Sequence, residues 1–258
     1  TQSFTNKSFG IRGLALLKAG KTAQEALDIL LSDDSGKEVR QVAIVDAKGN
    51  VANFTGKNCI DFAGDLKGKG YAIQANMMLT NEVPAAMAKA YEANLNLPLA
   101  ERVLATLKAA QKVGGDIRGK QSAVILVVKG EATGKPWDDN HLVDLRVDDH
   151  AAPLVELERL LTLHRAYEHM NNGDLATEKN DMPLAMKEYE AAMKMFPNNL
   201  EMQYWTAITL ANNGNVAKAA KILKGVYAKD PLWRELTKRL PKAGVLTVKA
   251  EEMGVLVK

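Results

Sequence analysis

The sequence contains a single cysteine, Cys59, and only four histidines among its 258 residues. One cysteine excludes an internal disulfide framework and any metal site built from several thiolates. The histidines are scattered along the chain, so we expect neither a metal site nor another cofactor. No histidine lies near Cys59 in the sequence to activate it, and a small buried side chain is its simplest interpretation.

An excess of one charge is also missing, because 34 lysines and arginines face 31 aspartates and glutamates. Binding to nucleic acid or to a membrane surface normally requires a basic cluster, and we expect neither. No apolar run approaches the roughly 18 residues that a membrane helix needs. We therefore expect a soluble globular protein, and the composition leaves its compartment open.

The familiar motifs of catalysis are absent as well: the sequence has no P-loop, GxGxxG, HExxH or GxSxG pattern. What it does have in residues 1–150 is an alternation of helical and strand patterns. Residues 11–34 predict two short amphipathic helices that are separated at Gly20, with Thr22 as the N-cap of the second. Residues 40–56 predict a hairpin, and residues 70–79 a further strand.

Two helical stretches follow, and residues 121–128 ("QSAVILVV") then predict a buried strand because they are short, apolar and rich in β-branched side chains. The segment "HLVDLRVDD" predicts the last strand. Its charged residues Asp144, Arg146 and Asp148 alternate to one face, which an ion-paired or solvated strand face explains without a site. Together these elements predict a layered α/β domain.

Residues 154–240 have a different pattern of successive amphipathic helices with an internal repeat. Pro197 and Pro231 lie 34 residues apart, and so do Ala185 and Ala219. A period of 34 residues is typical of tetratricopeptide (TPR) arrays of paired helices. In this interpretation each proline ends the second helix of a unit, and two glycines mark turns within units, Gly173 and Gly214. A generic helical hairpin is the alternative.

Three polar stretches stand out in the first half. They are residues 1–13, the strand "YAIQANMM" and the glycine-rich turn "GGDIRGKQSA". Gln74 and Asn76 alternate with apolar residues, so both amides point to one side of their strand. Asp116, Arg118, Gln121 and Ser122 surround the glycine turn. These groups suit recognition of a small polar substrate, and they also suit ordinary loop structure.

Four motifs in order, "TQSFTNKSFGIRGLALL", "YAIQANMM", "GGDIRGKQSA" and "VDLRVDDH", resemble the bacterial family DUF1028. That family is placed in the N-terminal nucleophile (Ntn) hydrolase superfamily. The resemblance implies an α/β fold, an Ntn-type αββα layered sandwich, over residues 1–152. The repeat independently predicts an all-α, TPR-like helical domain over residues 153–258.

The resemblance also implies a role for Thr1. Its hydroxyl would be the nucleophile and its free α-amine the base, because α-amines titrate close to neutral pH. The same hydroxyl would first cut the precursor before Thr1 and later form an acyl-enzyme with the substrate. A trimmed chain or a removed leader peptide would leave the same first residue, and both alternatives stay open.

Further residues are candidates for roles in the same mechanism because of their side-chain chemistry. Asn76 is the expected oxyanion donor, with Asn6 as second choice, and Asp116 would fix the α-ammonium or Arg118. An ion-pair network that shapes the loops is the alternative for the charged groups. The expected catalytic residues are Thr1, Asn76 and Asp116, and the expected substrate-binding residues are Asn6, Arg12, Gln74 and Arg118.

The expected function is that of an amidohydrolase that cleaves a C–N amide-type bond of a small molecule. The alternative is a non-catalytic Ntn-like binding module whose helical repeats mediate protein–protein interaction. The expected partners are a small amide-type substrate, an upstream peptide released by self-cleavage that remains packed on the chain, and a protein partner for the repeats. An oligomer is also expected.

Overall fold

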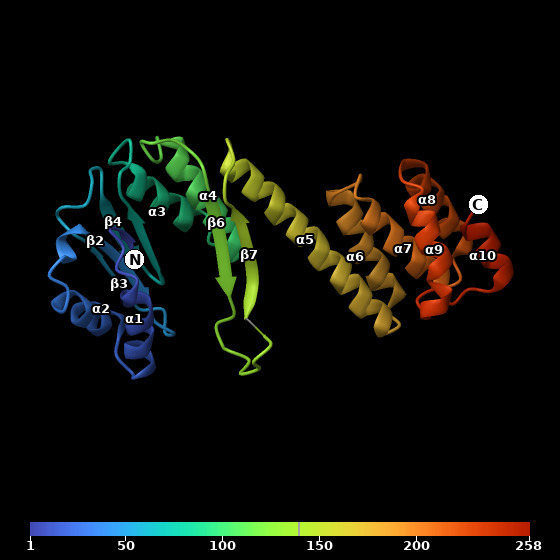
Figure 1. The fold of residues 1–258 in the computed structure, drawn as a ribbon, viewed down its shortest axis with the longest axis horizontal. Helices are drawn as coiled ribbons and strands as arrows, with labels where there is room; N and C mark the ends of the chain where they lie inside the picture. The colour runs from blue at the N-terminus through green and yellow to red at the C-terminus, as the bar shows by residue number, and fades with distance from the viewer. Residues whose placement is uncertain (139) are drawn as a thin grey trace. The chain divides into compact units, whose positions relative to one another are not determined.

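A computed structural model describes residues 1–138 and 140–258, and the chain divides into two units, Thr1–Arg159 and Leu160–Lys258. The first unit mixes helices with small sheets, and the second is helical (Figure 1). Helix α5 (Pro153–Glu178) contributes residues to both units. A mixed fold with a helical C-terminal region agrees with the prediction at this coarse level.

Sheet and helices at the start of the chain form the first core. Strands β1 (Gln2–Ser3), β2 (Arg40–Val45) and β3 (Val51–Thr55) form an antiparallel sheet in the order β1-β2-β3. Helices α1 (Ser8–Lys18) and α2 (Ala23–Ser32) bury their apolar faces against it. The predicted N-cap is confirmed, because Thr22 and Glu25 form a reciprocal capping box.

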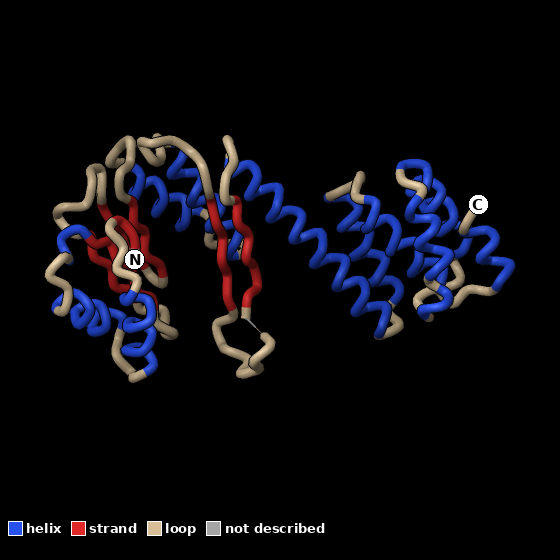
Figure 2. Tube along the Cα trace, viewed as in Figure 1, coloured by secondary structure: helices blue, strands red, loops and turns tan. Residues whose placement is uncertain are grey.

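A second small sheet lies against the first (Figure 2). It consists of β4 (Gly64–Gly68) and β5 (Tyr71–Ala75), which pair in antiparallel fashion. Helix α3 (Val83–Ala93) packs on both of these strands and on α4 (Leu99–Lys112). Side-chain hydrogen bonds join β5 to the backbone of β2 and β3, so the two sheets are linked by polar groups as well as by apolar packing.

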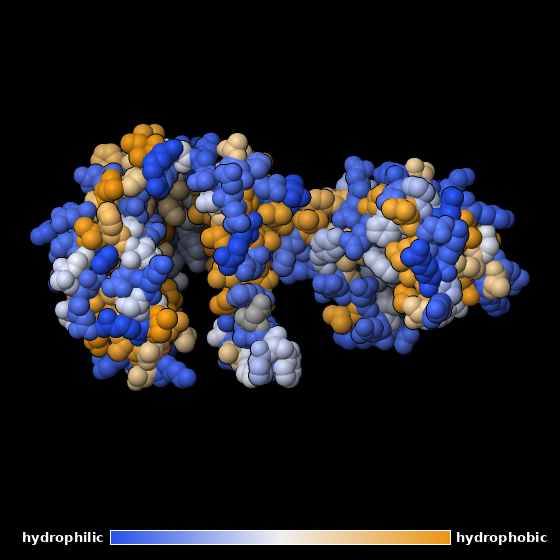
Figure 3. Space-filling view, viewed as in Figure 1, coloured by the Kyte–Doolittle hydropathy of each residue, from blue (hydrophilic) through white to orange (hydrophobic). Residues whose placement is uncertain are grey.

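The third sheet is the hairpin of β6 (Ala123–Val128) and β7 (His141–Val147). The prediction that the β6 segment is a buried strand is wrong for one of its faces. Ile125 is buried, but Val124, Leu126 and Val128 are each about half exposed. The reason is that helix α4 covers one face only, so the other presents apolar side chains (Figure 3). On β7, Asp144 and Arg146 form the predicted exposed ion pair.

The second unit is built from helix pairs around two apolar clusters. The predicted prolines do follow the second helix of a pair, and Ala185 and Ala219 are fully buried at equivalent positions. The remaining elements of this unit are α6 (Met182–Met195), α7 (Leu200–Asn212), α8 (Val216–Lys229), α9 (Leu232–Arg239) and α10 (Ala250–Leu256). Short 3₁₀ turns at Lys37–Val39 and Pro241–Ala243 complete the described elements.

One predicted turn is wrong. Gly214 does lie between α7 and α8 with a positive φ of 80°, but Gly173 lies inside α5 and is buried. The ring of Tyr189 rests where a Cβ on residue 173 would be, so the glycine is required for helix packing. The turn falls instead at Asn180, which has a φ of 59°.

The replacement Gly173→Ala should lower the free energy of unfolding by about 1–3 kcal/mol, because the added methyl overlaps the Tyr189 ring. Gly225→Ala on α8 is the matched control, since a Cβ there meets nothing within 4 Å. That control should be neutral or stabilising by up to about 1 kcal/mol, because alanine favours the helix. Urea unfolding followed by circular dichroism measures both, and equal stability of the two variants would contradict the packing role.

Among the described residues, no helix has both the length and the apolar character needed to span a bilayer.

Candidate functional site

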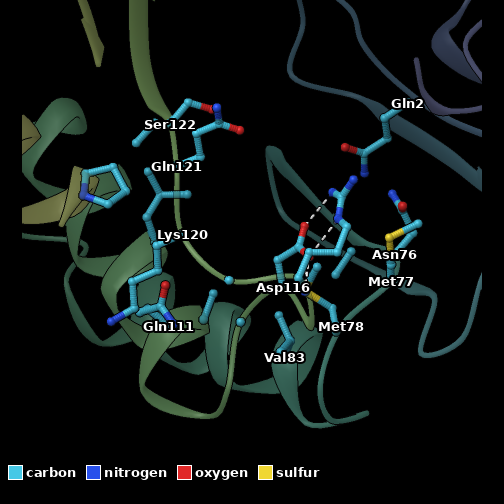
Figure 4. A pocket seen from close by; sticks show the side chains of 18 of the residues that line it. Gln2, Asn76, Met77, Met78, Val83, Gln111, Asp116, Lys120, Gln121 and Ser122 are labelled. Atoms are coloured by element: carbon cyan, nitrogen blue, oxygen red, sulfur yellow. Dashed lines mark hydrogen bonds and ion pairs between the residues drawn. The ribbon is translucent and has the colours of Figure 1, made fainter. Parts of the chain in front are cut away.

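A cavity of about 1080 Å³ lies within the first unit. One wall comes from β1 and from the end of β5, and the opposite wall from the glycine turn and the start of β6. Figure 4 shows Gln2 and Asn76 together on one side, and Gln111, Lys120, Gln121 and Ser122 on the other. Residues of all three polar stretches therefore line the cavity: the strand "YAIQANMM", the glycine-rich turn "GGDIRGKQSA" and the start of residues 1–13.

Gln41 is the buried centre of the polar network beside this cavity. It lies directly opposite Gln2 on β1 and Thr55 on β3, so three polar side chains form one row across the sheet. Its Oε1 accepts hydrogen bonds from Gln2 Nε2 at 2.7 Å and from Asn76 Nδ2 at 2.9 Å. Its Nε2 donates to Thr55 Oγ1 at 2.9 Å and to the carbonyl oxygen of Ala75 at 3.0 Å.

Gln41 was not among the predicted site residues. Its only signal in the sequence is an amide within the apolar strand "RQVAIV", and alternation alone cannot reveal what the amide meets. The structure gives the reason: the side chain is fully buried and satisfies groups from three different strands. Such a buried amide is stable only when its donors and acceptors are paired.

The replacement Gln41→Leu should lower the free energy of unfolding by about 2–4 kcal/mol, because it leaves several buried polar groups unpaired. Gln24→Leu on the exposed side of α2 is the matched control and should change stability by less than about 0.5 kcal/mol. Chemical denaturation of both variants checks this. A Gln41→Leu protein as stable as the control would show that the network carries no stability.

Asn76 and Gln74 both lie at the cavity wall, as their alternation on the strand predicts. Asn76 uses one N–H of its amide for Gln41, and no other hydrogen bond of its side chain is found among the described residues. A second N–H therefore remains for a ligand. The Gln74 amide is engaged differently, because its Nε2 donates to the carbonyl oxygens of Val42 and Phe54. Gln74 thus links β5 to the sheet of β2 and β3 through hydrogen bonds.

The glycine turn is attached to the end of β5 by backbone hydrogen bonds. Leu79 donates its N–H to the Gly115 carbonyl at 2.9 Å, and Ile117 donates to the Met77 carbonyl at 3.1 Å. Gly115 has a φ of 65°, a left-handed conformation that glycine adopts without strain. This pairing brings Asp116, 40 residues away in sequence, beside the wall that holds Asn76.

Asp116 and Arg118 form a two-point ion pair at the cavity. Arg118 Nε donates to Asp116 Oδ1 at 3.0 Å, and Nη2 donates to Oδ2 at 2.6 Å (Figure 4). The hydrogen bonds from Arg118 hold the pKa of the Asp116 carboxyl below its usual range. The Arg118 side chain is 70% exposed, so the carboxylate orients a guanidinium that solvent and ligands can reach.

The three residues predicted at the start of the chain lie outside the cavity lining. Thr1 is exposed and immediately precedes Gln2, which does line the cavity. Arg12 forms an exposed ion pair with Asp33. Asn6 accepts hydrogen bonds from Ser8 and donates a long one, 3.4 Å, to Asp34. The contacts of Asn6 and Arg12 are thus those of a folded N-terminal segment.

Asp34 anchors that segment through Arg40. Arg40 Nε donates to Asp34 Oδ2 at 2.8 Å, and Arg40 Nη1 donates to the Phe4 carbonyl at 2.6 Å. The hydrogen bond from Arg40 lowers the pKa of the Asp34 carboxyl to about 2. Because this pKa is lower in the folded state, the stabilisation is present above the unfolded-state value and is lost as pH falls toward 2.

The replacement Asp34→Asn should therefore flatten the pH dependence of stability between about pH 4 and pH 2, and lower stability at pH 7. Thermal melting of wild type and variant across this range is the measurement. If the melting temperatures of the two proteins fall by the same amount between pH 4 and pH 2, the role given to the ion pair is wrong.

Two cavity residues that sequence patterns did not single out have unusual backbones. Ser3 has a φ of 63° and Met77 a φ of 58°, although neither is glycine. Left-handed non-glycine residues are uncommon and gather at functional sites. Backbone angles of this kind leave no signal in a single sequence. In the described part of the chain, no group of His, Cys, Asp or Glu is arranged to hold a metal ion.

The fold and site define a protein with a mixed α/β unit that carries an amide-rich cavity, together with a helical unit. The model of the family described as "Family of unknown function (DUF1028)" matches residues 1–157, and the chain belongs to that family.

The crystal structure of protein SPO2555 from Silicibacter pomeroyi, of the same family, is similar to this chain with 32% identity and a TM-score of 0.53. The match covers 62% of this chain and 65% of that one, just under two thirds of its length. No curated protein matches this chain.

Proposed function

We propose that the first unit is an Ntn-type amidohydrolase, with an αββα layered sandwich and Thr1 as its nucleophile. The observation that carries this proposal is the hydrogen-bonded series Gln2–Gln41–Asn76. It links the residue next to Thr1 with an amide that has a donor to spare, both at the wall of one cavity. The stacking of α1 and α2, two sheets, and α3 agrees with such a sandwich.

In the proposed reaction, the Thr1 side chain rotates into the cavity beside Gln2. Its Oγ1 then attacks the substrate carbonyl carbon. The α-amine takes the hydroxyl proton, directly or through one water. The free N–H of Asn76 donates to the oxyanion of the tetrahedral intermediate. The C–N bond then breaks and the amine leaves with the proton. Water hydrolyses the ester on Thr1 and restores the hydroxyl.

Arg118 is the proposed binding group for a substrate carboxylate. Its orientation is fixed by Asp116, because both carboxylate oxygens accept hydrogen bonds from the guanidinium. Of the two roles expected for Asp116, holding Arg118 is therefore the one that its contacts support. Gln74 is a structural neighbour of the site in this account, because its amide is engaged by the sheet backbone.

We propose that the Thr1 hydroxyl also performs maturation, by cutting the precursor before Thr1. The upstream peptide then remains packed on the chain. The exposed apolar face of β6 supports a packed partner of this kind, since Val124, Leu126 and Val128 are left about half exposed by the described residues. The two-stranded β4–β5 and β6–β7 sheets also leave strand edges on which another strand can add.

Intact mass spectrometry of the complete gene product, wild type beside Thr1→Ala, tests this proposal. Self-cleavage predicts a wild-type fragment that begins at Thr1 and a variant that stays uncut. If both proteins stay uncut, or both are cut alike, Thr1 is not the agent of cleavage and maturation by self-cleavage is wrong.

A second candidate is a non-catalytic binding module, favoured by the position of Thr1 outside the cavity lining. In that case the helical unit, proposed as TPR-like from its 34-residue spacing, would bind a protein partner. Hydrolysis of any amide by wild type but not by Thr1→Ala decides against this candidate.

A further inference from the structure

The cavity has an apolar region next to Asn76. Its lining includes three methionines, Met77, Met78 and Met87, together with Val83 and Leu107. Figure 4 shows Met78 and Val83 near each other, on the far side of Met77 from Asn76. Methionine side chains are flexible and polarisable, and they accommodate apolar groups of varied shape. The volume of about 1080 Å³ lies slightly above the usual range of about 300–1,000 Å³ for small-molecule sites.

The glycine turn supplies two cations to the same cavity, Arg118 and Lys120. Arg118 uses Nε and Nη2 for Asp116, and its Nη1 makes no hydrogen bond within the described residues. Lys120 likewise has no ion-pair partner in the part of the chain that the structure describes. One more carboxylate, Asp149, lines the cavity from the segment after β7.

Asn76 lies on the cavity wall beside the apolar region, and Figure 4 shows Lys120 on the opposite side of the cavity. Met77 and Met78 follow it directly in the chain, whereas the cations come from the turn that pairs with residues 77–79. A carbonyl held at Asn76 can therefore extend one substituent among the methionines and the other toward Arg118 and Lys120.

We propose that the cavity takes a linear amide whose acyl half is an apolar chain and whose amine half carries a carboxylate: an N-acyl amino acid. The choice of bond to be cut rests on the proposed hydrolase function, whereas the binding of this ligand class does not. In that reaction, water adds its oxygen to the acyl carbon and its hydrogen to the amine nitrogen. The products are a fatty acid and an amino acid.

Calorimetric binding to wild-type protein tests the ligand class, with sulfonamides as probes because the enzyme cannot hydrolyse them. N-octylsulfonylglycine carries both halves, N-methyloctanesulfonamide lacks the carboxylate, and N-methylsulfonylglycine lacks the chain. We expect the first to bind at least tenfold more tightly than either of the others. Equal binding of the neutral probe would overturn the carboxylate half, and equal binding of the short probe would overturn the acyl half.

Variants locate the carboxylate half. Arg118→Gln and Lys120→Gln should each weaken N-octylsulfonylglycine about five- to tenfold and leave the neutral probe unchanged. Asp149→Asn should tighten the carboxylate probe, since it removes a like charge from the cavity. Lys48→Gln, in the exposed turn between β2 and β3, is the matched control and should change nothing. Weakening of both long probes alike by Lys120→Gln would contradict a carboxylate contact.

Hydrolysis is followed separately, as release of glycine from N-octanoylglycine. Binding of the sulfonamide without release of glycine would overturn the hydrolase function and leave the ligand class standing. Turnover of amides without preference for an apolar acyl chain or a carboxylate would overturn the ligand class and leave the hydrolase standing.

Discussion

Replacing Thr1 with alanine is expected to lower the rate of amide hydrolysis by about 10³-fold or more, because removal of a covalent nucleophile ends the acyl-enzyme route. Thr1→Ser should retain measurable activity, since it keeps a hydroxyl and the free α-amine. Single-turnover kinetics with N-octanoylglycine measure both variants, each produced without the upstream peptide so that all proteins begin at residue 1.

The control for this prediction is stability. Thr1 is exposed, so both variants should unfold within about 0.5 kcal/mol of wild type. A Thr1→Ala protein that is fully folded and as active as wild type would contradict the assignment of the nucleophile. Activity of that variant would direct attention to the hydroxyl of Ser3, which lines the cavity.

The second large effect is expected for Asn76→Ala, which should lower kcat by about 10²–10³-fold and change KM much less. The reason is that an oxyanion donor acts on the transition state and contributes little to binding of the ground state. Steady-state kinetics give kcat and KM separately.

Asn76 also donates to Gln41, so a structural loss must be distinguished from a catalytic one. Gln2→Ala is the matched variant, because it removes the other donor to the same oxygen. A similar fall in stability for the two variants, with a much larger fall in kcat for Asn76→Ala, is the expected result. Equal falls in kcat would mean that the network acts only by holding the site together.

Local signals in the sequence predicted much of the fold. The Thr22 cap, the break at Gly20 and the hairpin after Arg40 depend on residues close together in the chain, and each is confirmed. The 34-residue spacing similarly predicted that Pro197 and Pro231 follow the second helix of a pair, and they follow α6 and α8. Periodicity is informative here because each helix buries one face against its immediate neighbours.

Long-range packing accounts for the predictions that were wrong or missing. Gly173 looked like a turn residue, but its place is decided by the Tyr189 ring on the next helix. The β6 segment was expected to be buried, yet only its α4 side is covered. Gln41 was missed because its partners come from β1, β3 and β5, separated by up to 39 residues.

The candidate site was partly predictable for the same reason. Gln74, Asn76, Asp116 and Arg118 lie in polar stretches that interrupt apolar elements, and all four line one cavity. The methionines and Lys120 gave no such signal. Methionine in an apolar segment is usually core, and an isolated lysine in a loop is usually solvated. The pairing of residues 77–79 with the glycine turn brings Met77, Met78 and Lys120 to the cavity.

Covalent trapping of the nucleophile decides whether the Thr1 hydroxyl is the attacking group. An alkyl β-lactone is opened by an activated hydroxyl, which forms an ester and adds the whole mass of the lactone to the protein. One adduct is expected, located by peptide mass spectrometry on Thr1, and none is expected in the Thr1→Ala protein. Labelling of Ser3 or Cys59 with Thr1 unmodified, or equal labelling of the Thr1→Ala protein, would contradict it.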